Sequence, residues 1–218
     1  MQNADLGRAD LREADLSGAD LSGADLSNAD LRKVDLRDAN LWNASLSNAD
    51  LREADLSNTF LRDANLWNAS LSNTDLREAD LREADLSNAD LSDADLSNAH
   101  YTYTTKWPEG FDFRHSGAIG PEADLHAVDL SEANLNGVDL RDANLQNANL
   151  SNTNLNEAKL DGTDLQNANL KKTNLVGANL NEANLSNAIY DCRTKWPEDF
   201  DYKSAGAIEV PCEDGIEE

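Results

Sequence analysis

The chain has 218 residues and a formal net charge of −24, from 42 acidic and 18 basic side chains. A surface of this sign repels nucleic-acid phosphates and anionic lipid headgroups, so direct nucleic-acid binding and adsorption to acidic membranes are not expected. The sequence has no apolar run of about 18 residues to span a membrane, and no charged-then-apolar N-terminal stretch typical of a secretory signal. These observations predict a cytoplasmic protein without a membrane partner.

Leucine occupies every fifth position over two long stretches of the chain. It recurs nineteen times from Leu6 to Leu96 and thirteen times from Leu125 to Leu185. Ala, Val or Thr stands two residues before each leucine, and Asp or Asn usually separates the two, as at Asp5. A fixed period of this kind is typical of repeat architectures.

The five-residue period excludes the two simplest regular structures. On a helix, successive leucines would drift by about 140° and form no apolar stripe. On a continuous strand, an odd period would send alternate leucines to opposite faces. The pattern instead predicts very short strands of three residues, each followed by a corner of turn-forming residues, with leucine and the small residue pointing inward. Stacked coils of this kind would pair their backbones and fill a narrow core without voids.

The repeats resemble those of the pentapeptide repeat family, whose pattern is a small residue, Asp or Asn, Leu or Phe, and two polar residues. Representative runs are Ala-Asp-Leu-Gly-Arg at 4–8, Ala-Asp-Leu-Ser-Gly at 19–23 and Ala-Asn-Leu-Gln-Asn at 143–147. The resemblance covers residues 4–100 and 122–190. It implies an all-β fold, a right-handed quadrilateral β-helix with four pentapeptides per coil. The nineteen and thirteen repeats sum to thirty-two, which makes about eight coils and a rod roughly 38 Å long at a strand spacing of about 4.8 Å.

The leucine grid breaks once, and the break contains a second repeat. Residues 101–119 recur at 190–208 with eleven of nineteen positions identical. The chain is therefore interpreted as two copies of one unit, each an array followed by a terminal segment. The predicted domains are a first array at residues 1–100, an inserted cap-like segment at 101–121, a second array at 122–190, and a C-terminal cap with an acidic tail at 191–218.

The terminal segments contain most of the aromatic side chains, including Trp107 and Trp196. A hook of these residues over the last coil would cover the open edge and raw core of a solenoid, which otherwise invite aggregation. A ligand site built on the aromatics is the alternative. We favour one nearly continuous rod, because stacking of the two arrays buries both open ends. No comparable cap precedes Ala4, so the uncapped N-terminal coil is the candidate edge for self-association.

Three aromatic side chains depart from the pattern inside the first array: Trp42, Phe60 and Trp67. Residues 36–55 recur almost unchanged at 61–80, an offset of 25. On a coil of four pentapeptides, this offset puts Trp42 and Trp67 on adjacent faces, whereas Trp42 and Phe60 share a face in successive coils. Scattered exposed aromatics are common on proteins. The alternative is an interaction surface formed by these three residues.

No arrangement of residues indicates catalysis, a cofactor or a metal ion. His100, His115 and His126 lack a nucleophile or a second ligand at a suitable spacing, and a filled solenoid core has no active-site pocket. We therefore expect a protein that is not an enzyme. Cys192 and Cys212 allow two interpretations: unpaired thiols in a reducing compartment, or a disulfide that clasps the C-terminal segment.

Two functions follow as hypotheses. The first is a structural or protein-interaction solenoid with an unknown protein partner. The second comes from the resemblance, because quinolone-resistance members of the family mimic DNA and act on DNA gyrase. The arrays carry −12 over residues 4–99 and −6 over residues 122–189, a sum of −18, which is comparable with the roughly 22 charges on about 38 Å of duplex. Because a turn-rich scaffold also requires Asp and Asn, the interaction solenoid is favoured.

Overall fold

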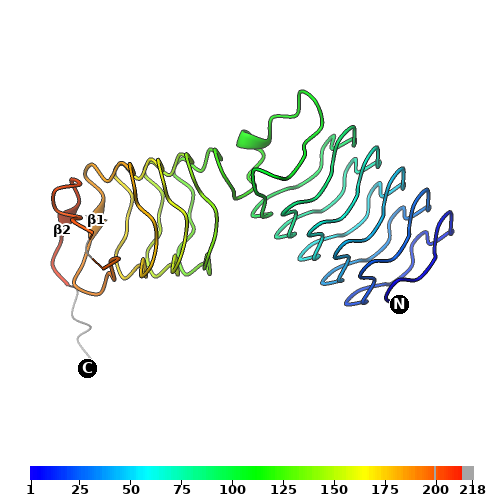
Figure 1. Ribbon diagram of the computed structural model, residues 1–218, viewed down its shortest axis with the longest axis horizontal. Helices are drawn as coiled ribbons and strands as arrows, with labels where there is room; N and C mark the ends of the chain where they lie inside the picture. The colour runs from blue at the N-terminus through cyan, green and yellow to red at the C-terminus, as the bar shows by residue number, and fades with distance from the viewer. Residues whose placement is uncertain (199, 213–218) are drawn as a thin grey trace. The chain divides into compact units, whose positions relative to one another are not determined.

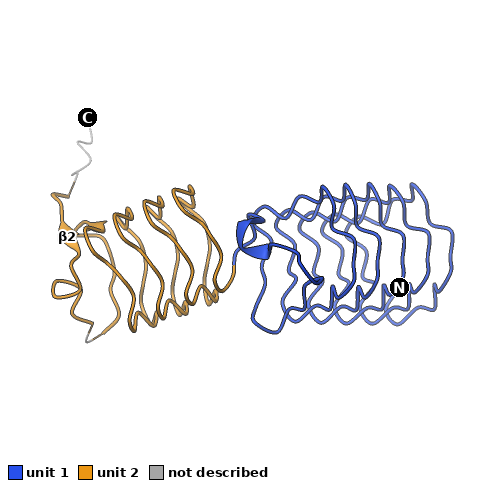
Figure 2. Cartoon of the chain, turned by 90° about the horizontal axis from the view of Figure 1, so that it is seen from above, with its two compact units in different colours: residues 1–119 blue, residues 120–218 orange. Residues whose placement is uncertain are grey.

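The computed structural model describes residues 1–198 and 200–212, and the chain divides into two compact units, Met1–Ile119 and Gly120–Glu218 (Figure 2). Within each unit the backbone winds in successive coils (Figure 1). The segment at 101–119 belongs to the first unit. The finer domain boundaries and the continuous rod stay predictions, and the acidic tail at 213–218 lies outside the described residues.

Backbone pairing between successive coils sets the fold of each unit. Asp5 pairs in parallel with Asp25, and Asp124 with Asn144, and this spacing of twenty residues is kept through both arrays. Four pentapeptides therefore complete one coil, as the resemblance implies. Most pairings are isolated bridges at the central residue, the Asp or Asn that directly precedes each leucine. The strands are therefore shorter than the three residues predicted. Among the described residues, the longer strands are β1, Ile189–Tyr190, and β2, Ile208–Glu209.

The central residue of a pentapeptide uses both of its backbone groups in this pairing. The amide of Asp25 donates to the carbonyl of Ala4 at 2.9 Å, and the carbonyl of Asp25 accepts from the amide of Leu6 at 2.7 Å. Because successive coils repeat this exchange, the backbone groups beside the narrow core are paired along the stack. Repetition of a short pairing, rather than long strands, holds each solenoid together.

The corners explain which residues stand between the leucines. The amide of Ala9 donates to the carbonyl of Leu6 at 3.0 Å, and Arg8, the third residue of this turn, has a φ of 62°. This combination is that of a type II turn, whose third position favours Gly and Asn, and both are frequent there in the repeats. The carboxylate of Asp5 accepts from the amide of Gly7 at 3.2 Å. A central Asp or Asn thus closes the corner from outside.

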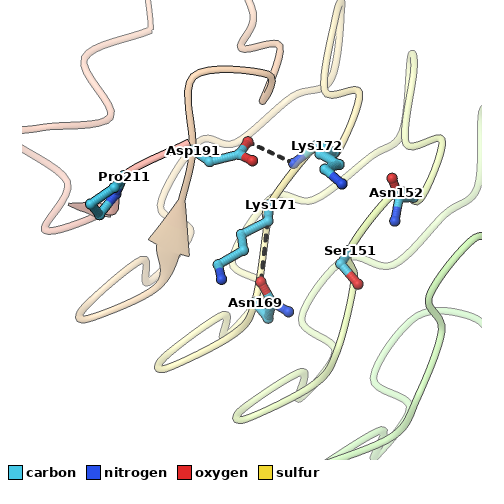
Figure 3. A pocket seen from close by; sticks show the side chains of 7 residues that line it. All are labelled: Ser151, Asn152, Asn169, Lys171, Lys172, Asp191 and Pro211. Atoms are coloured by element: carbon cyan, nitrogen blue, oxygen red, sulfur yellow. Dashed lines mark hydrogen bonds between the residues drawn. The ribbon is translucent and has the colours of Figure 1, made fainter. Parts of the chain in front are cut away.

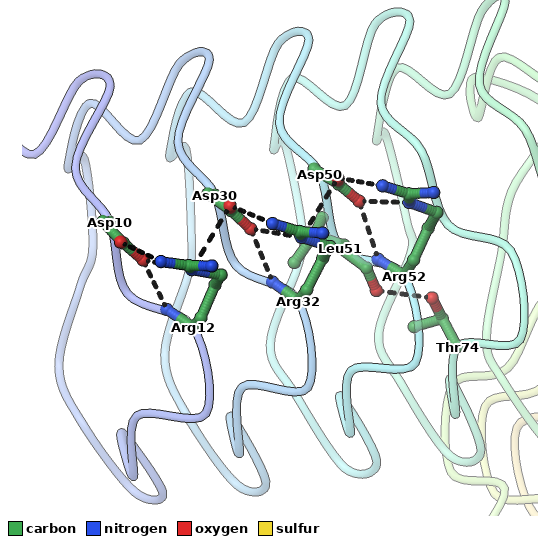
Figure 4. A network of polar contacts seen from close by, with 8 residues as sticks. All are labelled: Asp10, Arg12, Asp30, Arg32, Asp50, Leu51, Arg52 and Thr74. Atoms are coloured by element: carbon green, nitrogen blue, oxygen red, sulfur yellow. Dashed lines mark hydrogen bonds and ion pairs between the residues drawn. The ribbon is translucent and has the colours of Figure 1, made fainter.

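Leucine and the small residue fill the core, as predicted. Leu51 and Leu145 are fully buried, whereas Leu6 in the first coil is partly exposed. The self-association expected at that first coil stays a prediction. Where threonine takes the small position it adds a hydrogen bond, as the hydroxyl of Thr74 donates to the carbonyl of Leu51 at 2.9 Å (Figure 4). The same bond to a leucine carbonyl is made by Thr59, Thr105, Thr153, Thr163, Thr173 and Thr194.

Each array ends at an aromatic cluster, where the five-residue grid continues with tyrosine in place of leucine. Tyr101 and Tyr190 are buried like the leucines before them. Tyr101 meets Trp107 edge-on with ring centroids 5.5 Å apart, and Tyr190 meets Trp196 in the same way at 5.4 Å. The clusters are completed by Phe111 and Phe113, the latter in the 3₁₀ helix η1, Phe113–His115, and by Phe200 and Tyr202 in the second unit.

The two terminal segments also share their departures from the regular register. The pairings that differ from twenty residues are Asp85 with Lys106 and His100 with Ile119 in the first unit, and Asn174 with Lys195 and strand β1 with strand β2 in the second. In both units the first of these pairings is one residue longer and the second one residue shorter. The duplicated sequence therefore builds a duplicated structure.

The two cysteines lie in the second copy of the segment and just after it. Cys192 and Cys212 lie in disulfide geometry, with their Cα atoms 5.7 Å apart and a sequence separation of 20. At the offset of 89 residues between the two copies, the corresponding positions are Tyr103 in the first copy and Ala123 in the second array. The arrangement of Cys192 and Cys212 is that of the disulfide alternative, and the clasp itself stays a prediction.

Arginine and aspartate alternate along one side of the first unit (Figure 4). The register places Asp10, Asp30 and Asp50 one above another, and like charges directly opposite repel. The guanidinium of Arg32 relieves this repulsion, because it binds Asp30 at 2.6 Å and reaches Asp50 at 3.5 Å. The Arg12 side chain and then its backbone amide, by hydrogen bonding to the carboxylate, lower the pKa of Asp10 to about 2.

In the second unit, asparagine side chains stand at many of the stacked positions where the first unit has aspartate. The side-chain amide of Asn149 donates to Asp129 at 3.0 Å, and that of Asn169 donates to the Asn149 side chain at 3.0 Å. An amide carries both a donor and an acceptor, so it can stack on a copy of itself without repulsion. Asparagine columns therefore take the place of the charged ladder on this side of the unit, whereas Asp139 on another side still binds Arg141 at 2.6 Å.

Replacing Arg12 by Gln is expected to raise the pKa of Asp10 from about 2 toward the ordinary 3.8, because a charged hydrogen bond is lost. A lowered carboxyl pKa stabilises the folded state above the unfolded-state pKa. This contribution is therefore complete above about pH 4 and is lost as the pH falls through about 2. A carboxyl-carbon NMR titration measures the shift, and Arg8→Gln is the control for the charge change. A wild-type Asp10 that titrates near 3.8 would contradict the expectation.

Mass spectrometry of the non-reduced protein tests the clasp. Because the Cα separation of 5.7 Å suits a disulfide, we expect a mass lower by two hydrogens than after reduction. We also expect no thiol labelling in denaturant without reductant. Cys212→Ser is the matched control, since it leaves Cys192 open to labelling. Two labelled thiols in the non-reduced wild-type chain would support the unpaired alternative.

Candidate interaction surface

The coil register decides which of the three predicted aromatic residues come together. Trp42 lies two residues after Asn40 in the same pentapeptide, and Asn40 pairs with Phe60. Trp67 follows Asn65, which belongs to the ladder of another side. The exposed fractions are 52% for Trp42, 54% for Phe60 and 44% for Trp67. Trp42 and Phe60 therefore share one side of the first unit, and Trp67 lies on a different side.

Trp42 and Phe60 line an open hollow of about 360 Å³ that is completed by Asn40, Arg62 and Asp80. The indole of Trp42 is held by one hydrogen bond, because its Nε1 donates to Asp63 at 3.1 Å. The backbone amide of Trp42 donates to the side chain of Asn40 at 3.1 Å and closes the corner below the ring. About half of the Trp42 surface stays exposed.

Phenylalanine at a central position changes the partner of the neighbouring arginine. Elsewhere, as at Asp80, the central carboxylate binds the guanidinium two residues later, here at 2.5 Å. Phe60 offers no such acceptor, and Arg62 instead binds Glu83 at 2.6 Å and approaches Asp63 at 3.7 Å. The guanidinium that lines the hollow is thus held by two carboxylates. The hollow consequently combines two exposed rings with an acidic border.

Two further hollows are polar and contain none of the three aromatic residues. One, of about 180 Å³ in the second unit, is lined by Ser151, Asn152, Asn169, Lys171, Lys172, Asp191 and Pro211 (Figure 3). The carboxylate of Asp191 in this lining already accepts a hydrogen bond from the backbone amide of Lys172 at 2.9 Å. The other, of about 230 Å³, is lined by Arg12, Glu13, Arg32, Lys33 and Glu53.

The histidines are dispersed. His115 contacts Asp112 at 2.8 Å in the first terminal segment, whereas His100 occupies a central position that pairs with Asp80. Within residues 1–198 and 200–212, no group of three or more His, Cys, Asp or Glu side chains is placed to hold a metal ion. In the same part of the chain, no helix has the length and apolarity needed to cross a membrane.

The sequence alone predicts the two rings of the hollow but not the polar residues around them. The spacing in the sequence could have predicted two of these polar residues, because Arg62 lies twenty residues after Trp42, and Asp80 lies twenty residues after Phe60. On a coil of twenty residues, each pair must be stacked. The ion pair of Arg62 with Glu83 could not be predicted from the spacing, since it depends on the conformation of a long side chain.

Comparison with protein families gives one match. The family described as Pentapeptide repeats matches with eight copies, over residues 1–38, 29–68, 61–98, 123–162 and 158–189. These ranges include most of both arrays and well over half of the chain. No curated protein matches the chain.

Solved structures of similar proteins include two from Nostoc PCC 7120. HetL, a pentapeptide repeat protein involved in heterocyst differentiation regulation, is 33% identical; the match covers 87% of this chain and 90% of HetL, with a TM-score of 0.36. The pentapeptide repeat protein alr5209 is 37% identical over 53% of this chain and 84% of its own, with a TM-score of 0.27. QnrB1, a plasmid-mediated fluoroquinolone resistance protein, is 15% identical over 95% of this chain and 90% of its own, with a TM-score of 0.33. On the family match and the identity to HetL, the chain belongs to the pentapeptide repeat family.

Proposed function

We propose that this protein is a non-enzymatic interaction solenoid that presents a docking surface to a protein partner in the cytoplasm. In this proposal the scaffold is a right-handed quadrilateral β-helix of about eight coils. The docking surface is the Trp42–Phe60 hollow, with Trp67 as a second contact point on another side. The observation that carries the proposal is the exposure of two neighbouring rings, 52% and 54%, at positions where the repeats place polar residues.

The regular positions of the repeats have structural roles that these rings lack. Leucine fills the core, Asp and Asn close the corners, and Arg or Asn relieves the stacking of carboxylates. Phe60 does none of these, and its backbone pairing with Asn40 would be kept by any central residue. Large aromatic side chains are enriched among the residues that contribute most to binding. Interaction by way of an exposed surface also fits a family whose members are generally structural or interaction proteins.

Affinity capture from an extract of the source cells tests the surface. The double variant Trp42→Ser/Phe60→Asn is expected to reduce recovery of the partner at least about tenfold, because hot-spot aromatics are lost. The fold should be kept, since Ser22 and Asn40 show that these residues suit the same column. Trp67→Ser tests the second contact point separately, and serine suits that column because Ser47 and Ser87 occupy it in the neighbouring coils. Equal recovery by the double variant and the wild type would remove the hollow from the function.

DNA mimicry is the second candidate function, supported by the charge of −18 over the two arrays. The side shown in Figure 4 weakens it, because guanidinium groups alternate with the carboxylates there. Duplex DNA instead presents phosphates that have no covalent countercharge. In a supercoiling assay with purified DNA gyrase we expect neither inhibition nor protection at micromolar protein. Either effect would favour the mimic over the interaction solenoid.

A further inference from the structure

We propose that the Trp42–Phe60 hollow receives a cationic side chain, lysine or arginine, from a basic segment of the partner protein. This inference rests on the proposed function, because it specifies the chemistry of the partner at the same surface. It combines three observations: the two open rings, the acidic border of the hollow, and the engagement of Arg62.

The rings provide the attraction for a cation. Trp42 and Phe60 line one hollow and are each about half exposed. The face of an aromatic ring attracts a cation through its quadrupole, most strongly for tryptophan, and the aliphatic stem of lysine or arginine covers apolar surface at the same time. The chain makes such a contact itself, because the guanidinium carbon of Arg114 lies 4.8 Å from the ring centroid of Phe113.

The border of the hollow adds negative charge. Asp80 lines it and binds Arg82, Asp63 binds the Trp42 indole, and Glu83 binds Arg62. These three carboxylates outnumber the two guanidinium groups, so the border keeps a net negative charge. The net charge of the whole chain, −24, has the same sign. A field of this sign raises the rate at which a basic segment meets the surface and repels an acidic one.

Arg62 does not offset this preference. It is the cation of the hollow's described lining, but its guanidinium is bound by Glu83 at 2.6 Å and lies 3.7 Å from Asp63. An anionic ligand would have to compete with two carboxylates for that guanidinium. A cationic ligand instead meets free ring faces and leaves the ion pairs in place.

The size of the hollow sets the scale of the ligand. Its volume of about 360 Å³ is at the lower end of ligand pockets, and the hollow is open on one side. It therefore suits one or two side chains of an extended segment rather than a folded domain. Cation binding of this kind weakens with salt, whereas a purely apolar contact does not.

The test is an NMR titration of the full-length chain through its indole Nε1–H signals. The chain has four tryptophans, and Trp42→Ser identifies the signal of Trp42 by its loss. The probes are three capped glycine pentapeptides that carry two arginines, two glutamates or two leucines. We expect the arginine peptide to move the Trp42 signal and not the Trp67 signal. We also expect its affinity to fall roughly fivefold in Phe60→Asn and to fall with added salt.

Several results would overturn the assignment. They are an absence of any Trp42 shift with the arginine peptide, an equal shift with the glutamate or leucine peptide, and an affinity that Phe60→Asn leaves unchanged. The amide spectrum of each variant reports whether the coils remain folded. Phe60→Asn keeps the net charge, and Asn40 in the same column shows that the fold accepts asparagine.

The outcome separates this inference from the proposed function. If partner capture depends on Trp42 and Phe60 but the arginine peptide does not bind, the cation assignment fails while the docking surface stands. If the arginine peptide binds as expected but capture is unaffected by the double variant, the hollow binds cations and the proposed docking role fails.

Discussion

The paired hydrogen bonds between a central residue and the coil before it constrain everything else in the structure. They recur every twenty residues, so each outward side chain stands over its counterpart in the next coil. Each outward side chain must therefore suit both its position in the pentapeptide and the side chains stacked above and below it. A carboxylate faces a carboxylate unless another group intervenes, and the two units use different groups. Guanidinium ladders predominate in the first unit, and amide columns predominate in the second.

This constraint changes the meaning of the acidic composition. A central Asp is present because its carboxylate accepts the corner amide, as Asp5 does from Gly7. Asn performs the same task without charge, as Asn40 does for Trp42. Much of the net charge of −24 is thus a consequence of turn chemistry. Negative charge alone is therefore weak evidence for a DNA-like surface, and the informative residues are those without a structural role.

The leucine grid predicted the core and the corners because both follow from local spacing. It also extends to Tyr101 and Tyr190, which stand five residues after the last leucine of each array and are buried like it. The threonine hydroxyl bonds were not predicted, since Thr74 and Leu51 meet only through the coil register. The strands were predicted too long because bridging stops at the central residue. At the hollow, periodicity brings Trp42 to Phe60, but the redirected Arg62 depends on side-chain geometry.

The twenty-residue register has a consequence for how such a surface can change over evolution. Loss or gain of one pentapeptide between Trp42 and Phe60 would keep every repeat intact and still carry the two rings to different sides. A full coil added elsewhere in the first array would leave every column in order. The repeats stay intact after an insertion or deletion of five residues, but the columns of the surface stay in order only after one of twenty. A composite site on this scaffold is thus protected or destroyed by the length of an insertion, whatever its composition.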